Sequence, residues 1–422
     1  MHDSLDIAVI GGGVAGITAA YLLQAGHRVT LYEAGDYLGG HTHTVVVPDG
    51  PDAGTPVDTG FIVLNDRTYP LFNRLLARLG VATRATDMSF SYACRRTGME
   101  YASRNLGALF AQRRTLFDPG HLHMLAEILR FNRLVRRRLA TGRLAGTTLG
   151  RFLRVHGFGP RFRERYLIPM VAAIWSAPDA EAADFPMAAF ARFFENHGLL
   201  TVTDQPQWRF VAGGSHRYMQ AFARAFTGTL HLSAPVAGIR RRVEGVQLTL
   251  ADGAVHDHDR VVIAAHADEA LRLLEDPSPD ERRLLSAWRY SRNRVILHTD
   301  PVWMPANRRA WASWNYLRAA EGTGRSPVTV TYHMNRLQRL ATVNDYFVTL
   351  NPPHLPAAGR LVAEMTYHHP TYTFASLATQ GELARLNGRR HTDFCGSYFA
   401  NGFHEDAVRS AVEVAARFGI AL

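Results

Sequence analysis

A short apolar strand that runs into a glycine-rich turn constrains this chain more than any other feature. Residues 7–10 (IAVI) lead into Gly11, Gly13 and Gly16, and a helix is expected to begin at Val14. The first glycine permits a tight turn, the second lets the backbone approach a pyrophosphate, and the third lets helix and strand pack closely. The positive end of the helix dipole then faces the phosphates. The pattern predicts a Rossmann-like dinucleotide-binding unit.

The strand and loop that follow indicate which dinucleotide is bound. The strand of residues 28–32 is followed by Glu33, and an acid at this place accepts a hydrogen bond from a ribose hydroxyl. A nicotinamide-only fold does not need the next doublet, Gly39-Gly40, which is similar to the loop that covers the FAD pyrophosphate and ribityl chain in flavoproteins. We therefore expect FAD, against the alternatives of a nicotinamide-only domain or a decayed site. The contacts expected from these two motifs are Gly11, Gly13, Val14, Ala15, Gly16, Glu33, Ala34, Gly39, Gly40, His41 and Thr42.

The composition is that of a globular protein large enough for two cores. Of the 422 residues, 47% are hydrophobic and 20% are charged, and chains of this length commonly divide into domains. The two cysteines, Cys94 and Cys395, argue against a disulfide scaffold. No apolar run reaches the ~20 residues that span a bilayer, and nothing before the first strand resembles a signal peptide. We expect a cytoplasmic protein.

All 47 basic residues are arginines, and they are concentrated in one segment. The absence of lysine excludes Schiff-base catalysis by this chain. Residues 104–165 hold 14 arginines and only three acidic residues. A nucleic-acid partner is not expected, because no recognised binding module or aromatic platform accompanies this charge.

Residues 121–140 of this segment have the spacing of a basic amphipathic helix. Its predicted apolar stripe consists of Leu125, Ile128, Leu129, Val135 and Leu139. Such a helix either lies on an anionic membrane surface, or guards an anionic substrate, or packs as an ordinary solvated helix. The sequence leaves peripheral membrane contact through residues 104–165 open.

Hydrophobic patterns divide the chain into a nucleotide domain of three pieces and a substrate domain inserted between them. We assign residues 1–85, 205–275 and 389–422 to the FAD-binding domain. Residues 86–204, mainly helical and basic, and residues 276–388, which alternate as strands do, form the substrate domain. The predicted fold class is α/β, a Rossmann-like FAD-binding domain interleaved with an α+β substrate domain.

Several longer stretches carry a family resemblance that covers nearly the whole chain. The sequence resembles the flavin-containing amine oxidase superfamily, and within it a bacterial amine-oxidase-like group. The matching stretches are VDTGFIVLNDRTYP (57–70), MSFSY (88–92), IWSAP (174–178), FFENHGLL (193–200), GGSHRY (213–218), AWASWNY (310–316), VTYHMNRLQ (330–338) and GFHED (402–406).

The resemblance implies further FAD contacts, position by position. Val236 matches a residue whose backbone contacts adenine, and Ala264 and Ala265 match the small residues beneath the dinucleotide. Asp58, Thr59 and Gly60 match an acidic loop near the flavin ring. The N-terminus of the last helix, matched by Glu405, Asp406, Ala407 and Val408, would face flavin N1 and C2=O, where reduced flavin is negative. Asp406 departs from the glycine that many members have there.

The resemblance also implies a mode of FAD attachment and a class of substrate. Cys395 does not match the usual attachment position, so noncovalent FAD is expected. The group includes a desaturase of methylated fatty acyl chains on the route to furan fatty acids. Its members resemble, and often accompany, methyltransferases of the cyclopropane-fatty-acyl-phospholipid synthase type. A lipid acyl substrate and such a methyltransferase partner follow from the resemblance alone.

The catalytic residues are less clearly indicated. Typical amine oxidases hold a water beside flavin N5 with a lysine and align the amine with two aromatic rings. This chain has no lysine; Phe403 matches one aromatic position, and Tyr398 is close to it in sequence. Desaturation of an alkyl chain also needs a base, for which histidine is suited at neutral pH. The candidates are His404, by location the first choice, and His333, with His197, His368 and His369 as further options.

Three hypotheses about function remain open. The first is an FAD-dependent desaturase or oxidase of unsaturated or methylated, phospholipid-linked acyl chains. The second is an amine oxidase that releases aldehyde and peroxide. The third is a flavin- and lipid-binding partner of a methyltransferase without activity of its own. No metal site is expected, because the His41 and His43 pair has no companion ligands.

Overall fold

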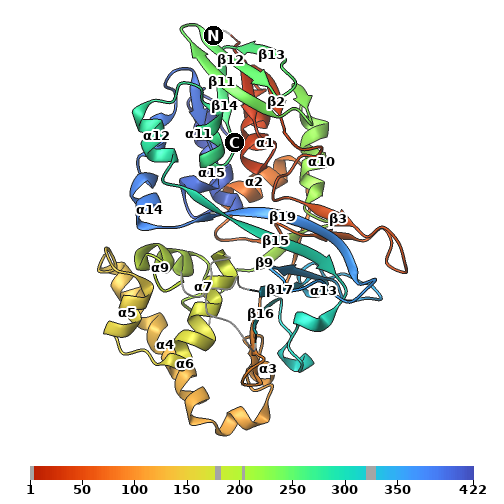
Figure 1. Cartoon of the computed structure of the whole chain (residues 1–422), viewed down its shortest axis with the longest axis vertical. Helices are drawn as coiled ribbons and strands as arrows, with labels where there is room; N and C mark the ends of the chain where they lie inside the picture. Colours follow the sequence, from red (N-terminus) through yellow and green to blue (C-terminus); the bar gives the residue numbers. More distant parts are fainter. Residues whose placement is uncertain (1–3, 176–181, 202–204, 320–328) are drawn as a thin grey trace.

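The computed structural model describes residues 4–175, 182–201, 205–319 and 329–422, and these form two halves (Figure 1). The upper half contains both ends of the described chain. The lower half holds the helices that lie between residues 106 and 196. Two long strands, β15 (Arg289–His298) and β19 (Leu361–Thr371), cross the molecule between the halves.

A five-stranded parallel sheet forms the centre of the upper half. Its order is β10-β2-β1-β14-β20, so strands from distant parts of the sequence lie side by side. A buried core of Ile, Val, Leu and Ala side chains joins this sheet to its helices. The strands are β1 (Asp6–Ile10), β2 (Arg28–Tyr32), β10 (Thr229–His231), β14 (Arg260–Ile263) and β20 (Thr392–Phe394), and the helices are α1 (Val14–Leu23), α2 (Pro70–Arg78), α10 (His216–Ala225) and α15 (His404–Ala416).

A seven-stranded mixed sheet lies below it, in the order β19-β15-β18-β17-β16-β7-β8. Two of its strands, β7 (Phe90–Cys94) and β8 (Met99–Ala102), belong to the segment from which the sequence predicts mainly helix. Every residue of both strands is buried, so neither shows the alternation typical of a half-exposed strand. The remaining strands are β16 (Trp314–Arg318), β17 (Thr329–His333) and β18 (Phe347–Leu350).

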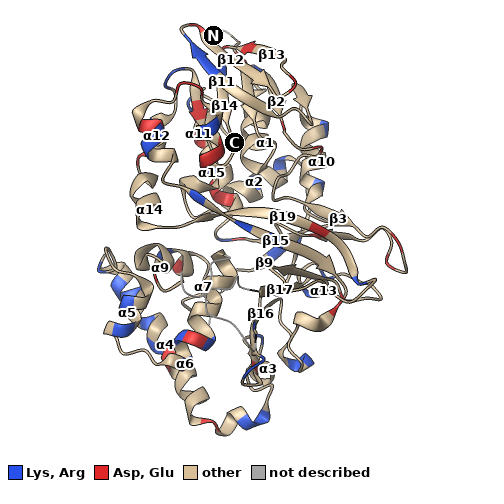
Figure 2. Ribbon diagram, viewed as in Figure 1, with Lys and Arg blue, Asp and Glu red and all other residues tan. Residues whose placement is uncertain are grey.

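Helices cover the lower end of this sheet, and most of the arginine-rich segment lies in them (Figure 2). The longest, α4 (Pro119–Ala140), buries Met124, Phe131 and Val135. The predicted apolar stripe is wrong at Leu129, which is 52% exposed, because the buried face is rotated toward Phe131 and Asn132. Its neighbours are α3 (Leu106–Leu109), the 3₁₀ turn Arg113–Phe117, α5 (Leu149–Val155), α6 (Pro160–Phe162), the π-helical turn Arg163–Leu167, α7 (Ile168–Trp175) and α9 (Met187–Asn196).

Smaller elements connect the two halves and lie beside the upper sheet. The strands are β3 (Thr44–Val46), β4 (Pro56–Asp58), β5 (Leu64–Asn65), β6 (Thr83–Ala85), β9 (Trp208–Val211), β11 (Val236–Arg242), β12 (Gly245–Leu250) and β13 (Val255–His258). The helices are α11 (Ala267–Leu273), α12 (Pro279–Leu285), α13 (Met334–Leu337) and α14 (Phe374–Gln380), with short 3₁₀ turns at Pro301–Trp303, Arg308–Ala310, Leu383–Leu386 and Ser397–Phe399.

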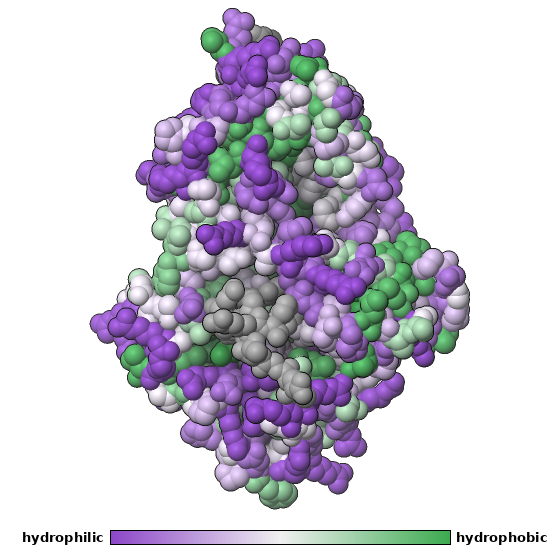
Figure 3. All heavy atoms as spheres, viewed as in Figure 1, coloured by the Kyte–Doolittle hydropathy of each residue, from purple (hydrophilic) through white to green (hydrophobic). Residues whose placement is uncertain are grey.

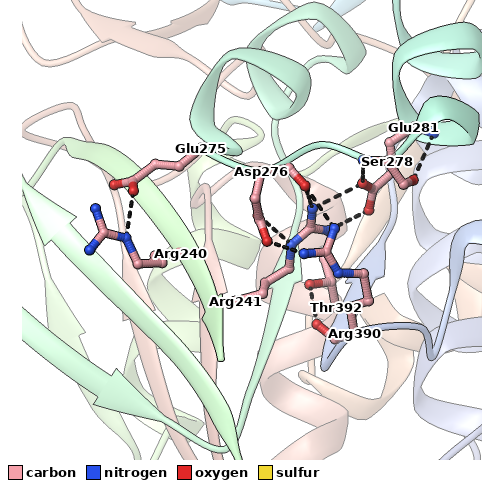
Figure 4. Close-up of polar contacts among 8 residues, drawn as sticks. All are labelled: Arg240, Arg241, Glu275, Asp276, Ser278, Glu281, Arg390 and Thr392. Carbon is pink, nitrogen blue, oxygen red and sulfur yellow. Dashed lines mark hydrogen bonds and ion pairs between the residues drawn. The ribbon is translucent and has the colours of Figure 1, made fainter. Parts of the chain in front are cut away.

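A buried ion-pair cluster fixes α12 against β11 (Figure 4). The Arg241 side chain is 1% exposed and donates to Asp276 at 2.9 Å and to Glu281 Oε2 at 3.0 Å. Glu281 also accepts from the backbone N–H of Ser278 at 2.7 Å. Because every charge in the cluster has a partner, the desolvation cost of burying it is offset.

Candidate flavin-binding and active site

The glycine-rich turn has the geometry that a dinucleotide requires. Gly11 has φ +101°, and a Cβ on Gly16 would lie 1.8 Å from the Gly11 carbonyl oxygen. A Cβ on Gly13, by contrast, would meet no atom within 4 Å. Gly13 is the N-cap of α1, and no side chain caps that helix. An open backbone before uncapped N–H groups is what a pyrophosphate needs, so these residues fit a bound dinucleotide.

The second glycine motif lies directly against the first. Gly39 N donates to Gly12 O at 3.0 Å, and a Cβ on Gly39 would lie 2.2 Å from the carbonyl oxygen of Thr42. Glu33 accepts from Gly12 N at 2.6 Å and from Gly35 N at 2.7 Å, so its carboxylate is fixed beside the turn. The acid expected to hold a ribose hydroxyl is therefore also a brace for the loop that would bind the phosphates.

Of the other predicted dinucleotide contacts, Ala264 lies against this turn. Ala264 and Ala265 follow β14, and the Ala264 carbonyl oxygen would lie 2.8 Å from a Cβ on Gly11. Val236 begins β11 and is half-buried. Ala34 is exposed, whereas Val14 and Ala15 are buried in the first turn of α1.

The Asp58-Thr59-Gly60 loop is held by side chains from distant segments. The Asp58 carboxylate accepts from Ser215 N and Ser215 Oγ, both at 2.8 Å, and from Gln338 Nε2 at 2.9 Å. Burial raises the pKa of Asp58 to about 6. Thr59 Oγ1 lies 2.7 Å from the Tyr367 hydroxyl. The Asp58 side chain thus braces the loop, and Ser215 and Gln338 are contacts that the sequence did not assign.

Gly60, the last residue of this loop, packs closely against the backbone of His41. A Cβ on Gly60 would lie 2.1 Å from the His41 carbonyl oxygen. The His41 ring lies 5.1 Å from the Tyr367 ring and 5.3 Å from the His369 ring, centroid to centroid. Burial and the neighbouring histidines lower the pKa of His41 well below its usual range. Of these, Tyr367 was not anticipated; the signal was its place in the TYHHP stretch.

His404 is the first residue of α15 and is held by three neighbours. Its Nε2 lies 3.0 Å from Thr42 Oγ1 and 3.2 Å from the Tyr218 hydroxyl, and its ring stacks on Phe61 at 3.7 Å. Thr42 and Tyr218 also contact each other through their hydroxyls. Burial lowers the pKa of His404 to about 3. A pKa this low does not favour proton abstraction at neutral pH.

The next residues of α15 brace its own N-terminus and that of α2. The Asp406 carboxylate accepts from Phe403 N at 3.0 Å and Asn401 N at 3.1 Å, and burial raises its pKa to about 6. The Glu405 carboxylate accepts from Phe72 N at 2.9 Å and from Leu71 N. Both acids therefore turn toward protein backbone. Ala407 and Val408 are buried in the core of the upper half.

An aromatic cavity of about 60 Å³ lies beside the loop that leads into α15. Phe403 is next to it and stacks on Phe193 at 4.8 Å. Apart from Arg192, every side chain that lines the cavity is uncharged. The lining is Trp175, Phe185, Ala189, Arg192, Phe193, Tyr372, Leu377, Gln380, Ala400 and Asn401.

Two further predicted catalytic residues, Tyr398 and His333, do not line the cavity. Tyr398 is buried, and its ring packs against Trp288 and Phe399. His333, at the end of β17, lies 2.9 Å from Asp345 and packs against Trp311. The 3₁₀ turn that contains Tyr398 packs against α15, and Gln380 of the cavity lining donates to the Tyr398 carbonyl oxygen. The catalytic roles of Tyr398 and His333 stay predictions.

Residues 4–175, 182–201, 205–319 and 329–422 contain neither a membrane-spanning helix nor a cluster of metal-binding side chains. The helices resolved in those ranges include none that is both long and apolar enough to cross a bilayer. Within the same ranges, histidine, cysteine and acidic side chains form no group of three that could hold a metal ion.

Comparison with known proteins identifies the family. The sequence model of the flavin containing amine oxidoreductases matches residues 14–418. "Putative flavin-containing monoamine oxidase AofH" of Mycobacterium tuberculosis is 27% identical over 319 residues, 71% of this chain and 66% of that protein. The chain thus spans just under two thirds of that relative's length. The 15-cis-phytoene desaturase of Glycine max is 26% identical over 301 residues, 64% of this chain and 49% of the desaturase.

Solved structures show the same fold. A fatty acid isomerase from P. acnes that produces CLA has a TM-score of 0.71 at 17% identity, with 99% of both chains covered. A double mutant of putrescine oxidase has a TM-score of 0.72 at 16% identity, covering 98% of this chain and 99% of the oxidase.

The fold, the two glycine motifs and the match to the family model define an FAD-dependent oxidoreductase. The chain belongs to the flavin containing amine oxidoreductase family. This confirms the fold class, FAD as the cofactor and the family resemblance predicted from the sequence; the noncovalent attachment stays a prediction.

Proposed function

We propose that this oxidoreductase dehydrogenates an unsaturated or methylated fatty acyl chain, as part of a phospholipid or as a related anionic lipid. The observation that carries the proposal is the aromatic cavity beside the α15 loop, whose lining contains no acidic side chain. A polyamine needs carboxylates to pair with its ammonium groups, whereas an alkyl chain needs apolar contact.

The residues around the cavity suit an alkyl chain. Phe185, Phe193 and Tyr372 supply broad apolar surfaces. These side chains would contact a short part of the alkyl chain through van der Waals packing.

Arg192 is the charged group of this cavity. Its side chain is exposed, and it forms no ion pair with another described residue. A guanidinium at this place would bind a carboxylate or phosphate and so orient the lipid with its alkyl chain toward the aromatic lining.

The bound flavin would supply hydride acceptance from a substrate C–H bond. The α1 turn and the Gly39-Gly40 loop would hold the dinucleotide. His404 then has a positioning role, because its contacts with Thr42 and Phe61 connect α15 to that loop. An enzyme that methylates acyl chains is the class of partner that would supply a methylated substrate.

Anaerobic flavin reduction tests the proposal. The purified holoprotein is mixed with vesicles of unsaturated or methylated phospholipids, with vesicles of fully saturated phospholipids, and with a panel of amines. Bleaching of the oxidised flavin by the first set alone is the expected result. Bleaching by amines alone would make the protein an amine oxidase, and bleaching by none would favour a non-catalytic partner of a methyltransferase; either result overturns the proposal.

A further inference from the structure

We propose that the protein docks on anionic lipid bilayers through the distal tip, defined as residues 104–122. The distal tip comprises α3, the 3₁₀ turn Arg113–Phe117 and the first residues of α4. It lies at the lower end of the molecule, opposite the parallel sheet (Figure 1). The surface there carries an apolar group among hydrophilic ones (Figure 3).

The first observation is a concentration of exposed apolar side chains. Phe117 is 85% exposed and Leu106 is 75% exposed; Leu116 and Leu122 are 45% and 44% exposed. Single exposed apolar residues are ordinary on a protein surface, but four large ones within 17 residues of chain are not.

The packing of the distal tip holds these side chains outward. The small residues Ala108 and Thr115 face the interior and are buried. Thr115 Oγ1 donates to Gln112 O at 2.7 Å. Asn105 caps α3 by accepting from Ala108 N at 2.8 Å. Asn307, which precedes the 3₁₀ turn Arg308–Ala310, donates from its Nδ2 to Ala111 O at 2.9 Å and so connects the distal tip to that turn. The exposed residues therefore project from a braced turn.

The charge around the apolar group has one sign. Arg104, Arg113 and Arg114 are exposed. The acid of the tip, Asp118, accepts from Gly120 N at 2.9 Å and pairs with Arg161 at 2.8 Å, so its charge is neutralised. With three arginines and one acidic residue, residues 104–122 carry a net positive charge. Arginine side chains around an apolar wedge suit anionic headgroups above acyl chains.

The size and shape of the tip favour a bilayer over a protein. A stable protein interface needs about 800 Å² from each partner, with a flat or concave apolar centre. A narrow turn with four apolar side chains offers less, whereas insertion into the headgroup boundary requires only a few. A second copy of this chain would bring arginines against arginines. A lipid surface is the occupant that satisfies both the apolar and the charged groups.

Vesicle co-sedimentation of the purified holoprotein tests the docking without reference to turnover. Binding is measured to vesicles of phosphatidylcholine with phosphatidylglycerol and to vesicles of phosphatidylcholine alone. The test variant is Phe117→Ser with Leu106→Ser, and a second is Arg113→Glu with Arg114→Glu. The matched control is Val243→Ser, which removes another exposed apolar side chain, in the β11–β12 turn.

The docking predicts binding to the anionic vesicles that weakens in high salt and is at least about fivefold weaker on neutral ones. Each double variant should lose about tenfold in partitioning, while Val243→Ser should bind as the wild type does. Equal melting temperatures establish that the variants are folded. Failure of the wild type to bind anionic vesicles, or unchanged binding by both double variants, would overturn the proposal. So would self-association that the Phe117 and Leu106 substitutions abolish.

The docking proposal and the proposed acyl-chain substrate can be contradicted independently of each other. Vesicle binding without flavin reduction would support the distal tip and contradict the substrate. Reduction by detergent-dispersed lipid without vesicle binding would support the substrate and contradict the distal tip.

Discussion

The Asp58 carboxylate accepts two hydrogen bonds from Ser215, one from its backbone N–H and one from its hydroxyl, both at 2.8 Å. The two residues lie 157 positions apart in the sequence. Gln338, from the substrate half, donates to the same carboxylate. One buried acid thus joins three segments of the chain at the loop that the family resemblance places near the flavin ring.

Replacing Asp58 should destabilise the protein. In Asp58→Ala, the Ser215 N–H and the Gln338 amide lose their acceptor in the interior, which should lower the free energy of unfolding by about 2–4 kcal/mol. Urea denaturation at pH 7 measures this, with the exposed Asp49→Ala as control. Equal denaturation midpoints for the two variants would contradict the bracing role of Asp58.

A substitution at Gly13 should affect FAD binding without affecting folding. A Cβ at this position meets no protein atom within 4 Å, but it stands where the pyrophosphate would approach. Gly13→Ala should therefore keep the melting temperature of the apoprotein and weaken FAD binding on the order of tenfold or more. Gly26→Ala is the control, since its Cβ would make only an ordinary contact, 3.7 Å from Ile420. Undiminished flavin content in Gly13→Ala would place the cofactor elsewhere.

His404 should make stability fall in acid. The pKa of His404 is about 3 in the folded protein and 6.5 in an unfolded chain. Between pH 3 and pH 6.5 the unfolded chain binds more protons at this residue than the folded protein does, so acid favours unfolding. The contribution of neutral His404 to the free energy of unfolding is therefore complete above pH 6.5 and is lost as the pH falls. His404→Gln removes it, and the loss of unfolding free energy from pH 7.5 to 5.5 should shrink by about 1.4 kcal/mol. Denaturation series at both pH values measure this, with the exposed His123→Gln for comparison; identical losses in all three proteins would refute the buried neutral state.

Arg240 and Arg241, both drawn in Figure 4, should differ sharply in their effect on stability. Arg241→Met leaves the Glu281 carboxylate buried without its partner, which should cost about 3–5 kcal/mol. Arg240→Met breaks an exposed pair with Glu275 and should cost about 0–1 kcal/mol. Comparable losses of unfolding free energy in the two variants would show that burial does not govern this cluster.

Arg192 should affect the binding of anionic lipids more than turnover. Arg192→Gln should raise KM for an anionic lipid about fivefold and leave kcat unchanged, because the lost guanidinium acts on the headgroup. Arg151→Gln removes an exposed arginine of α5, outside the cavity lining, and is the control for net charge. A fall in kcat at unchanged KM would contradict the headgroup role.

The sequence predicted best the parts of the molecule that depend on local rules. The strand of residues 28–32 is β2, because apolar alternation and the glycine turn before it act within a short stretch. Strand β7 escaped notice since Phe90–Cys94 is buried on both faces. Leu129 was misplaced because the buried face of α4 is set by its packing against α6 and α9, which the helical period alone does not reveal.

The candidate site also has parts that a local sequence pattern predicts and parts that depend on distant segments. The glycine motifs were recognisable because their spacing encodes backbone geometry. The environment of His404 was not, since Tyr218 and Phe61 reach it from segments 186 and 343 residues away. Its low pKa follows from that burial, which no local pattern contains.

Mass spectrometry of the acyl chain after anaerobic incubation tests the central claim most directly. The holoprotein is incubated with unsaturated or methylated phospholipid until the flavin is reduced, and the lipid is then analysed. The account predicts chains that have lost two hydrogens, in an amount equal to the flavin reduced. Reduced flavin with unchanged chains, or chains changed only in the position of a double bond, would contradict dehydrogenation as the reaction.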